Sequence, residues 1–430
     1  MLRKWVYLAG VYLRNKKIFD AYDFLLKSQH WSLDSLREYQ LGKLKDLVYH
    51  AYSNCKFYRD RFNAIGLHPK DIQSLEDLKR IPITTKEDLL SNTGNIQIHN
   101  YPEKLFYSET SGSSGKPLVF YRNADWDAWH RASVYRGYSW YGVKPWEKNG
   151  YFWGYNLAFK RRLRVRLLDY LQNRFRLFSY NDQEIDNFVR KLRRASYLEG
   201  YSSMIYEVAK RINEKRIKPE FNLKMVKGTS EKIFEKYQDE GEKAFAKKII
   251  SEYGAAEAGI IAFECPFGNM HINMETVIVE EENNEIIVTN LVSKSFPIIR
   301  YKLGDYVVVE NGVKCGCGMQ RPVIKEVLGR VGKVIYGLKC EYPSLTLYYV
   351  FKNLAMENKL ILNYQALQER KGHLLISVES RLKDYERTML LREVYKYFGD
   401  DLELNIVDNV SMKSSNKKKG DFVSKVQELY

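Results

Sequence analysis

The apolar residues of this chain change their spacing along its length, and this change limits the folds that it can adopt. Residues from about 1 to 95 follow helical spacing, whereas helical and strand patterns alternate through the middle of the chain. From about residue 271 the pattern switches to hairpins, and after Gly329 about a hundred residues combine strands and helices. We predict an α/β fold: a large N-terminal domain of layered sheets and helices at residues 1–331, and a smaller, mobile α+β C-terminal lid domain at residues 332–430.

The same spacing places individual elements. It predicts helices that begin near Asp182 and Ser202, and an apolar strand that ends near Tyr253. Strands over residues 276–280 and 285–291 flank Asn283-Asn284, and Asn311-Gly312 is a second hairpin signal. In the C-terminal domain we expect strands over 373–378 and 402–407 and helices over 346–354 and 385–397.

The composition is that of a folded, basic protein. Of the 430 residues 45% are apolar, and the formal net charge is +16 at pH 7. This charge favours anionic partners such as nucleotides, acyl carriers, nucleic acid or an acidic membrane face, and a generally basic solvated surface is the alternative. The basic runs at 160–166 and 190–194 lack the aromatic platforms of a single-strand binder, so we expect no specific nucleic-acid partner.

The N-terminus combines basic and apolar residues without the pattern of a membrane span. No stretch of about 18 consecutive apolar residues occurs in the chain. Residues 5–13 are followed at once by Arg14, Lys16 and Lys17 rather than by a small-residue cleavage site. We therefore expect a cytoplasmic protein whose first helix lies on a membrane surface, as a peripheral attachment, or on the protein itself. Five cysteines, an odd number, argue against a secreted disulfide scaffold.

The sharpest local signal is a loop of small hydroxylated residues with two glycines: Thr110-Ser111-Gly112-Ser113-Ser114-Gly115-Lys116. Its backbone N–H groups can cradle phosphate oxygens, while the hydroxyls and the lysine add donors and positive charge. The glycine spacing and the following Pro117 exclude the Walker P-loop, which has four residues between its glycines and Ser or Thr after its lysine. Taken alone, this stretch is either a phosphate-binding loop or a flexible segment.

Three further motifs follow the loop: Tyr253-Gly254-Ala255-Ala256-Glu257, Arg300-Tyr301-Lys302-Leu303-Gly304-Asp305 and Gly329-Arg330. In type and order the four stretches resemble the motifs of adenylate-forming enzymes, the superfamily of acyl-coenzyme A synthetases, peptide-synthetase adenylation domains and luciferases. Residues 57–59, 78–86, 199–202 and 228–231 are similar to the phenylacetate–coenzyme A ligase family, including its relatives encoded with capsule-polysaccharide genes. The resemblance covers nearly the whole chain.

The resemblance implies a role for each motif in binding ATP and Mg²⁺. Residues 110–116 would hold the β- and γ-phosphates. Tyr253 would stack near adenine, with Ser230 and Glu231 beside it. Glu257 would hold Mg²⁺, a hard cation that prefers carboxylate and phosphate oxygens. The rest of the nucleotide site would come from Gly254, Ala255 and Ala256, from Asp305, which would accept hydrogen bonds from the ribose hydroxyls, and from Arg330, which would lie near the ribose at the hinge.

The family also supplies a catalytic lysine from the end of its small domain. Here the candidates are Lys417, Lys418 and Lys419, and counting back from Phe422 favours Lys418, although the usual Ser-Gly-Lys is altered and a solvated tail is the alternative. Two other departures are Ala256, where the family has Thr, and Gly332, where the hinge usually has an acidic residue. Glycine can still bend, so rotation of the small domain stays possible.

Three cysteines and one histidine form a second candidate site. Cys265 and His271 are separated by five residues, and Cys315 and Cys317 by one, just after Asn311-Gly312. Three thiolates and one imidazole make a tetrahedral zinc set. Similar residues occur in some members of the family that the chain resembles, so we predict a structural Zn²⁺; core cysteines with a surface histidine are the alternative.

These observations predict a ligase that uses ATP and Mg²⁺ to activate a small carboxylic acid as an acyl-adenylate, with release of pyrophosphate, and passes the acyl group to coenzyme A. A sugar, an amine or a carrier protein in polysaccharide biosynthesis is the alternative acceptor. A catalytically inactive basic protein that binds a membrane or nucleic acid is the rival from another class. Aromatic candidates for the acid pocket, or for the core, are Phe152, Trp153, Tyr155 and Tyr201.

Overall fold

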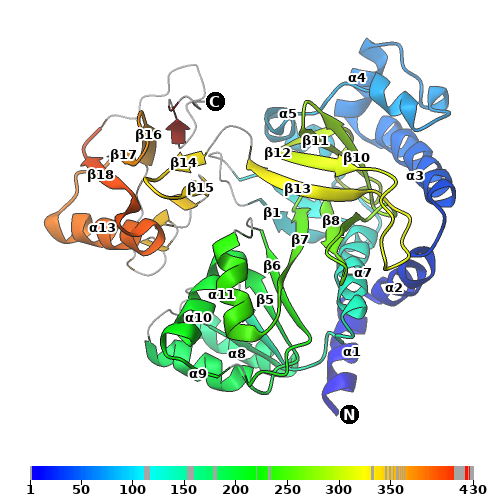
Figure 1. The fold of residues 1–430 in the computed structure, drawn as a ribbon. Helices are drawn as coiled ribbons and strands as arrows, with labels where there is room; N and C mark the ends of the chain where they lie inside the picture. Colours follow the sequence, from blue (N-terminus) through cyan, green and yellow to red (C-terminus); the bar gives the residue numbers. More distant parts are fainter. Residues whose placement is uncertain are drawn as a thin grey trace. The chain divides into compact units, whose positions relative to one another are not determined.

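The computed structural model of the protein describes residues 2–110, 117–152, 159–177, 182–218, 220–230, 233, 235–330, 334–343 and 364–410, with short pieces between 346 and 362 and between 422 and 426. These residues form two compact units, one with residues up to 110 and from 119 to 328, the other with residues 117–118 and from 329 onward. The predicted mixed α/β class is confirmed (Figure 1). The predicted domain border, at residues 331 and 332, lies outside the described residues.

Residues 2–96 are mainly helical, as the apolar spacing over residues 1 to 95 predicted. Ser32 begins the longest of these helices, α3, by accepting a hydrogen bond from the backbone N–H of Ser35 at 3.2 Å. Thr85 and Asp88 form a capping box at the start of α5. The elements are α1 (Leu2–Asn15), α2 (Lys17–Ser28), α3 (Leu33–Asn54), α4 (Lys56–Ala64), η1 (Pro69–Asp71), η2 (Glu76–Arg80), α5 (Lys86–Ser91) and α6 (Thr93–Ile96). A short hairpin follows, formed by β1 (Phe106–Glu109) and β2 (Val119–Arg122).

An eleven-stranded sheet forms the centre of the first unit, in the order β10-β11-β12-β13-β9-β8-β7-β6-β5-β3-β4. One half is parallel, from β4 through β3, β5 and β6 to β7, and β8 and β9 continue the sheet in antiparallel fashion. The strands are β3 (Asn149–Phe152), β4 (Arg174–Arg176), β5 (Tyr197–Tyr201), β6 (Met225–Thr229), β7 (Ile249–Ala255), β8 (Gly259–Glu264), β9 (Met270–Ile272), β10 (Val277–Glu282), β11 (Glu285–Asn290), β12 (Tyr301–Glu310) and β13 (Val323–Arg330).

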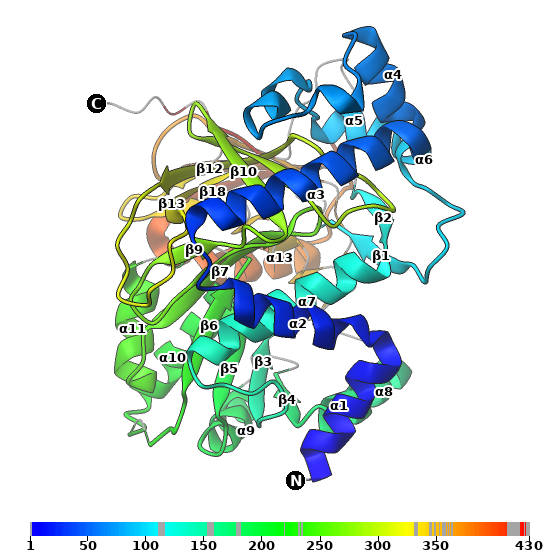
Figure 2. The same ribbon diagram turned by 90° about the vertical axis from the view of Figure 1, so that its right-hand side faces the viewer.

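Helices pack against this sheet, most of them against strands of its parallel half. They are α7 (Ala124–Trp140), α8 (Phe159–Leu171), α9 (Asp182–Leu192), α10 (Ser202–Glu214) and α11 (Glu235–Phe245). The two helices predicted to begin near 182 and 202 are confirmed as α9 and α10, and their apolar faces are buried. Figure 1 shows α9, α10 and α11 beside β5 and β6, and Figure 2 shows α2 lying along α7.

Of the two hairpins predicted from turn residues, one is confirmed as a short hairpin and the other has a longer connection. Asn283 and Asn284 have φ angles of 54° and 62°, and they join β10 to β11 in the predicted hairpin. Gly312 also has a positive φ, 72°, but β13 begins only at Val323. The connection from β12 to β13 is therefore longer than the short hairpin that Asn311-Gly312 predicted, and it carries Cys315 and Cys317.

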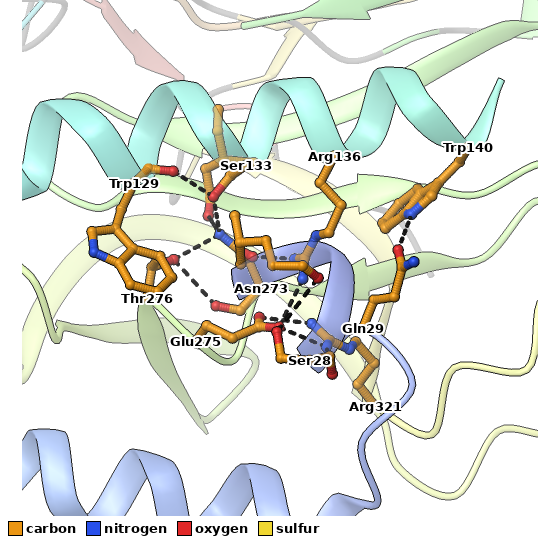
Figure 3. A network of polar contacts seen from close by, with 12 residues as sticks. Ser28, Gln29, Trp129, Ser133, Arg136, Trp140, Asn273, Glu275, Thr276 and Arg321 are labelled. Atoms are coloured by element: carbon orange, nitrogen blue, oxygen red, sulfur yellow. Dashed lines mark hydrogen bonds and ion pairs between the residues drawn. The ribbon is translucent and has the colours of Figure 1, made fainter. Parts of the chain in front are cut away.

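A buried ion cluster joins four segments of the first unit (Figure 3). The Glu275 carboxylate accepts hydrogen bonds from Arg136 of α7 at 2.7 Å, from Arg321 at 2.8 Å through each of two nitrogens, and from the Ser28 hydroxyl at 2.5 Å. Burial alone would raise the pKa of Glu275, but the positive charges of the two arginines hold this pKa well below its usual range. The cluster thus fixes α2, α7, the turn before β10 and the segment before β13 to one another.

The second unit has its own core. A four-stranded sheet has the order β18-β17-β16-β19 and carries one long helix, α13 (Asp384–Phe398), whose Leu390 and Val394 are buried. The strands are β16 (Tyr364–Gln368), β17 (His373–Val378), β18 (Glu403–Val407) and β19 (Phe422–Ser424), with a separate pair, β14 (Val334–Tyr336) and β15 (Glu341–Pro343). The strands predicted at 373–378 and 402–407 and the helix predicted at 385–397 are confirmed, and residues 346–347, 350–351 and 353–354 are helical as predicted.

Candidate active site

Two motifs predicted to bind ATP belong to β7 and β12, which three other strands separate in the order of the large sheet. The first runs along the end of β7 into the turn that precedes β8, and the second begins at β12. Gly254 lies at a bulge between β7 and β8, where a Cβ atom would lie 2.4 Å from the carbonyl oxygen of Gly259. This close approach explains why the first motif needs glycine at its second position.

The two motifs bind each other through two tyrosine–carboxylate pairs. The Tyr253 hydroxyl donates to Oδ2 of Asp305 at 2.8 Å. In the opposite direction, the Tyr301 hydroxyl donates to Oε1 of Glu257 at 3.2 Å. Asn290 fixes the backbone carbonyl of Glu257 at 2.9 Å, and both Glu257 and Tyr301 are buried. Each motif therefore orients the acidic side chain of the other, and the two carboxylates are held in one region.

Arg300, the first residue of the second motif, has a structural role. Its φ angle is 45°, a left-handed conformation that is rare for residues other than glycine. Its guanidinium group donates to the carbonyl oxygens of Lys79 and Ile81 at 2.9 and 2.7 Å, and forms an ion pair with Glu280 at 3.0 Å. Backbone hydrogen bonds from Thr84 to Arg300 and from Lys302 to Thr84 join the same two stretches. Residues 78–86 thus hold the start of β12 in place.

Two polar residues of α7 lie near the first motif, and no motif or residue spacing in the sequence identified them. Nε1 of Trp126 and Nδ1 of His130 are buried and have no hydrogen-bond partner. A Cβ atom at Gly259 would lie 3.8 Å from the first of these atoms and 3.5 Å from the second. Burial lowers the pKa of His130 to about 3, and nearby Arg122 and Arg131 add to this effect, so the ring is neutral at pH 7. The two residues stand out because their nitrogens are buried and unpaired, and these properties can be seen only in the three-dimensional structure.

Ser230 and Tyr201, which were predicted for the nucleotide site and the acid pocket, lie at the edge of the sheet where its parallel strands end. Parallel strands end at a common edge, where open α/β sheets bind ligands. Ser230 directly follows β6 with a φ angle of 66°, and β6 pairs with β7 up to Thr229 and Glu252. Tyr201, proposed for the acid pocket, ends β5 opposite Thr229. Phe152 is instead part of the hydrophobic core, where its ring stacks on Phe188 at 4.8 Å.

The remaining predictions fall on parts of the chain that the structure does not describe. Thr110 follows β1 at the start of the predicted phosphate loop. Outside the described residues lie Ser111 to Lys116, Trp153, Tyr155, Glu231, Gly332 and the candidate lysines Lys417, Lys418 and Lys419. Arg330 ends β13, and its side chain also lies outside the described part. The roles of all these residues stay predictions.

The four predicted zinc ligands come together in one cluster. Their ligand atoms all lie within 4.8 Å of one another, with Sγ of Cys315 3.6 Å from Sγ of Cys265 and Sγ of Cys317 3.2 Å from Nε2 of His271. Four tetrahedral ligands at about 2.3 Å from a metal are about 3.8 Å apart, so the cluster fits zinc in size and chemistry. The Asn269 side chain donates to Sγ of Cys315 at 3.2 Å, as a partner that orients a metal ligand would.

Comparison with known proteins finds ligases among the relatives of this chain. No protein-family model matches it. Protein CapK of Staphylococcus aureus is 25% identical over 320 residues, which make up 69% of this chain and 68% of that protein. Phenylacetate-coenzyme A ligase of Escherichia coli K12 is 36% identical over 136 residues, 29% of each chain.

Among solved structures, 2-hydroxyisobutyryl-CoA ligase in complex with 2-HIB-AMP and CoA has the same fold. The TM-score is 0.66 and the sequence identity 19%, over 93% of this chain and 91% of that one. The chain is thus a homologue of Protein CapK and of phenylacetate-coenzyme A ligases, with the fold of the acyl-coenzyme A ligases of the adenylate-forming superfamily.

Proposed function

We propose that this protein is an ATP-dependent ligase that activates a carboxylic acid as an acyl-adenylate, releases pyrophosphate and transfers the acyl group to coenzyme A. The two reciprocal tyrosine–carboxylate pairs carry the proposal. They hold Asp305 and Glu257 in one region, beside the edge where the parallel strands end. In this proposal Asp305 accepts hydrogen bonds from the ribose hydroxyls and Glu257 holds Mg²⁺ beside the phosphates.

The chemistry explains why such a site needs fixed groups. A carboxylate attacks the α-phosphorus poorly because both reactants are negatively charged, so the enzyme must neutralise charge and align the reacting atoms. The Tyr301 hydroxyl restrains one oxygen of Glu257, and the Asn290 amide restrains the backbone beside it. The carboxylate is therefore oriented before any ligand binds, which lowers the entropic cost of binding a cation.

The unpaired nitrogens of Trp126 and His130 support a place for the acid near Gly259. Each is a polar atom without a partner, and buried polar atoms normally have one. An acid with an oxygen at this spot would supply an acceptor for the indole N–H. One residue separates Gly259 from Glu257, so an acid bound here would be close to the proposed cation.

We also propose that the cluster of Cys265, His271, Cys315 and Cys317 holds a structural Zn²⁺. Thiolate and imidazole ligands in a closed set of four suit a structural zinc, which keeps no open position for a substrate. Zinc would fix the connection from β12 to β13 onto β8 and β9. The metal content of the protein can be measured after purification without chelator. Well under one zinc ion per chain would contradict this assignment.

Pyrophosphate exchange into ATP, measured with a panel of aryl, fatty, amino and hydroxy acids, tests the proposed activation step. We expect exchange with at least one acid, and a loss of about 10²-fold or more in the Asp305→Asn variant. Glu310→Gln is the matched control on the same strand, because Glu310 is exposed and forms its ion pair with Lys325, which is also exposed. Exchange with no acid, or equal exchange in both variants, would contradict the proposal.

The acceptor is tested separately, with the acid that supports exchange. Formation of the acyl thioester is followed with coenzyme A, and amide formation with amines and amino sugars as the alternative acceptors. Thioester formation supports coenzyme A. Exchange without any thioester, together with an amide product, would identify an amine as the acceptor. The proposed activation step would still hold.

A further inference from the structure

Exposed apolar side chains concentrate on two helices of the first unit, α1 and α8. Of the large apolar side chains that are well exposed in the described part of the chain, nine belong to these helices: Leu2, Trp5, Val6, Tyr12 and Leu13 on α1, and Leu167, Leu168, Tyr170 and Leu171 on α8. Scattered exposed leucines are ordinary on protein surfaces, but a concentration of them marks an interaction site.

The apolar residues of α1 lie on the face that points away from the protein. Val11 and Asn15 are buried, and the Tyr7 hydroxyl contacts the Tyr135 hydroxyl of α7 at 2.8 Å. At 3.6 residues per turn, the five exposed apolar residues of α1 fall within about 120° on the opposite side. Leu13 is 82% and Trp5 is 64% exposed. This helix therefore has an apolar stripe facing solvent, in addition to the face that it packs against α7.

The helix α8 repeats the arrangement and contacts α1 (Figure 2). Its buried Asp169 forms an ion pair with Arg176 at 2.9 Å, whereas Leu167 and Tyr170 on the outer side are 60% and 68% exposed. The guanidinium group of Arg3 in α1 donates to the Asn173 side chain and lies 5.8 Å from the centre of the Tyr170 ring. The exposed apolar residues of the two helices thus belong to one corner of the unit.

The same corner is strongly basic. Residues 2–17 contain five basic residues and no acidic one, and residues 159–171 contain five basic residues and one acidic one. That single acid, Asp169, is buried in its ion pair. Arg3, Lys4 and Lys16 of the N-terminal segment and Arg166 of α8 are exposed. Tryptophan, tyrosine and leucine between lysines and arginines form the pattern of helices that lie in a lipid headgroup region.

We infer that the corner formed by α1 and α8 binds the surface of an anionic lipid bilayer, with the apolar stripe of α1 inserted among the headgroups. A second copy of this chain fits less well, because a symmetric contact would bring two basic corners of the same charge together. Nucleic acid fits less well because Leu2, Leu13 and Leu167 offer phosphates no hydrogen bond. In the described part of the chain no helix is long and apolar enough to span a bilayer, so this is attachment to one face.

Flotation of the full chain with vesicles tests this inference independently of the ligase activity. The vesicles contain phosphatidylcholine alone or mixed with phosphatidylglycerol. We expect binding to the anionic vesicles, weakened by salt, and little binding to the neutral ones. Arg166→Gln should weaken binding about fivefold. Joint replacement Trp5→Ser and Leu13→Ser should weaken it at least about tenfold.

Two matched variants control for changes that are not specific to this corner. Tyr49→Ser removes an aromatic residue of α3 that is 62% exposed, and Arg37→Gln removes an exposed charge of the same helix. Both should bind like the unchanged protein, and circular dichroism should show that every variant is folded. Absence of binding to anionic vesicles would overturn the inference. So would equal binding to both vesicle types, or self-association that the Trp5 and Leu13 replacements abolish.

Discussion

Replacing Glu275 with glutamine should destabilise the first unit severely. The side chain is fully buried and accepts four hydrogen bonds, three of them from the guanidinium groups of Arg136 and Arg321. Glutamine keeps the size but removes the negative charge, and its amide group presents N–H donors to N–H donors. Removing one partner from a buried ion cluster costs about 3–5 kcal/mol, because the remaining charges stay buried without compensation.

Tryptophan fluorescence during urea unfolding can measure this loss in the first unit alone, since all seven tryptophans lie before residue 154. Glu282→Gln is the matched control, because Glu282 is exposed on the adjacent hairpin; we expect a change within about 0.5 kcal/mol. The comparison requires that both variants unfold in one cooperative step with similar denaturant dependence. A loss below about 1 kcal/mol in Glu275→Gln would refute the reasoning from buried charge.

The pH dependence gives a second check on the same residue. The pKa of Glu275 is lower in the folded state than in the unfolded chain, where it is about 4.3. The charged carboxylate therefore stabilises the fold fully above about pH 5, and this contribution is lost as the pH falls toward the folded-state pKa. The stability difference between the original protein and Glu275→Gln should shrink between about pH 5 and pH 3. A difference that stays constant over this range would contradict the assignment.

Three further predictions concern the two proposed sites and the second unit. Tyr253→Phe removes the hydrogen bond to Asp305 and should raise the KM for ATP in pyrophosphate exchange, with a smaller effect on stability of about 1 kcal/mol; an unchanged KM would contradict the role of this pair. Cys315→Ser should reduce the bound zinc and lower the melting temperature, and a chelator should affect the original protein more than this variant. Lys418→Ala should abolish exchange without changing the melting temperature, and full activity would move the catalytic role to a neighbouring lysine.

Local features of the fold could be predicted from the sequence because each depends on residues that are close in the chain. Asn283 and Asn284 accept the positive φ that a tight hairpin needs, and β10 and β11 form around them. Similarly, the apolar spacing of α9 and α10 depends on a few turns of one helix. The cysteine cluster could be predicted because thiolates and imidazole in this number suit few other purposes.

Contacts between distant segments could not be predicted in this way. Ser28, Arg136, Glu275 and Arg321 are far apart in the chain, and nothing in their local sequence distinguishes them from surface residues. The prediction that Asn311-Gly312 makes a short hairpin failed for a related reason. Gly312 has the positive φ of a turn, but β13 starts only at Val323, after Cys315, Cys317 and Arg321. The buried contact of Arg321 with Glu275 fixes the segment just before β13.

The arginine of the second motif shows how the fold positions the site. A left-handed backbone at a residue other than glycine costs on the order of 1–3 kcal/mol, and it persists only where the surroundings impose it. At Arg300 the surroundings do so: its backbone N–H donates to the Thr289 hydroxyl at 3.0 Å, and its guanidinium group is bound to Glu280 and to the carbonyl oxygens of residues 79 and 81. This conformation determines where β12 begins, and hence where the Tyr301 hydroxyl meets Glu257. Arg300 is therefore a positioning residue, because its guanidinium group holds the backbone from which Tyr301 reaches Glu257.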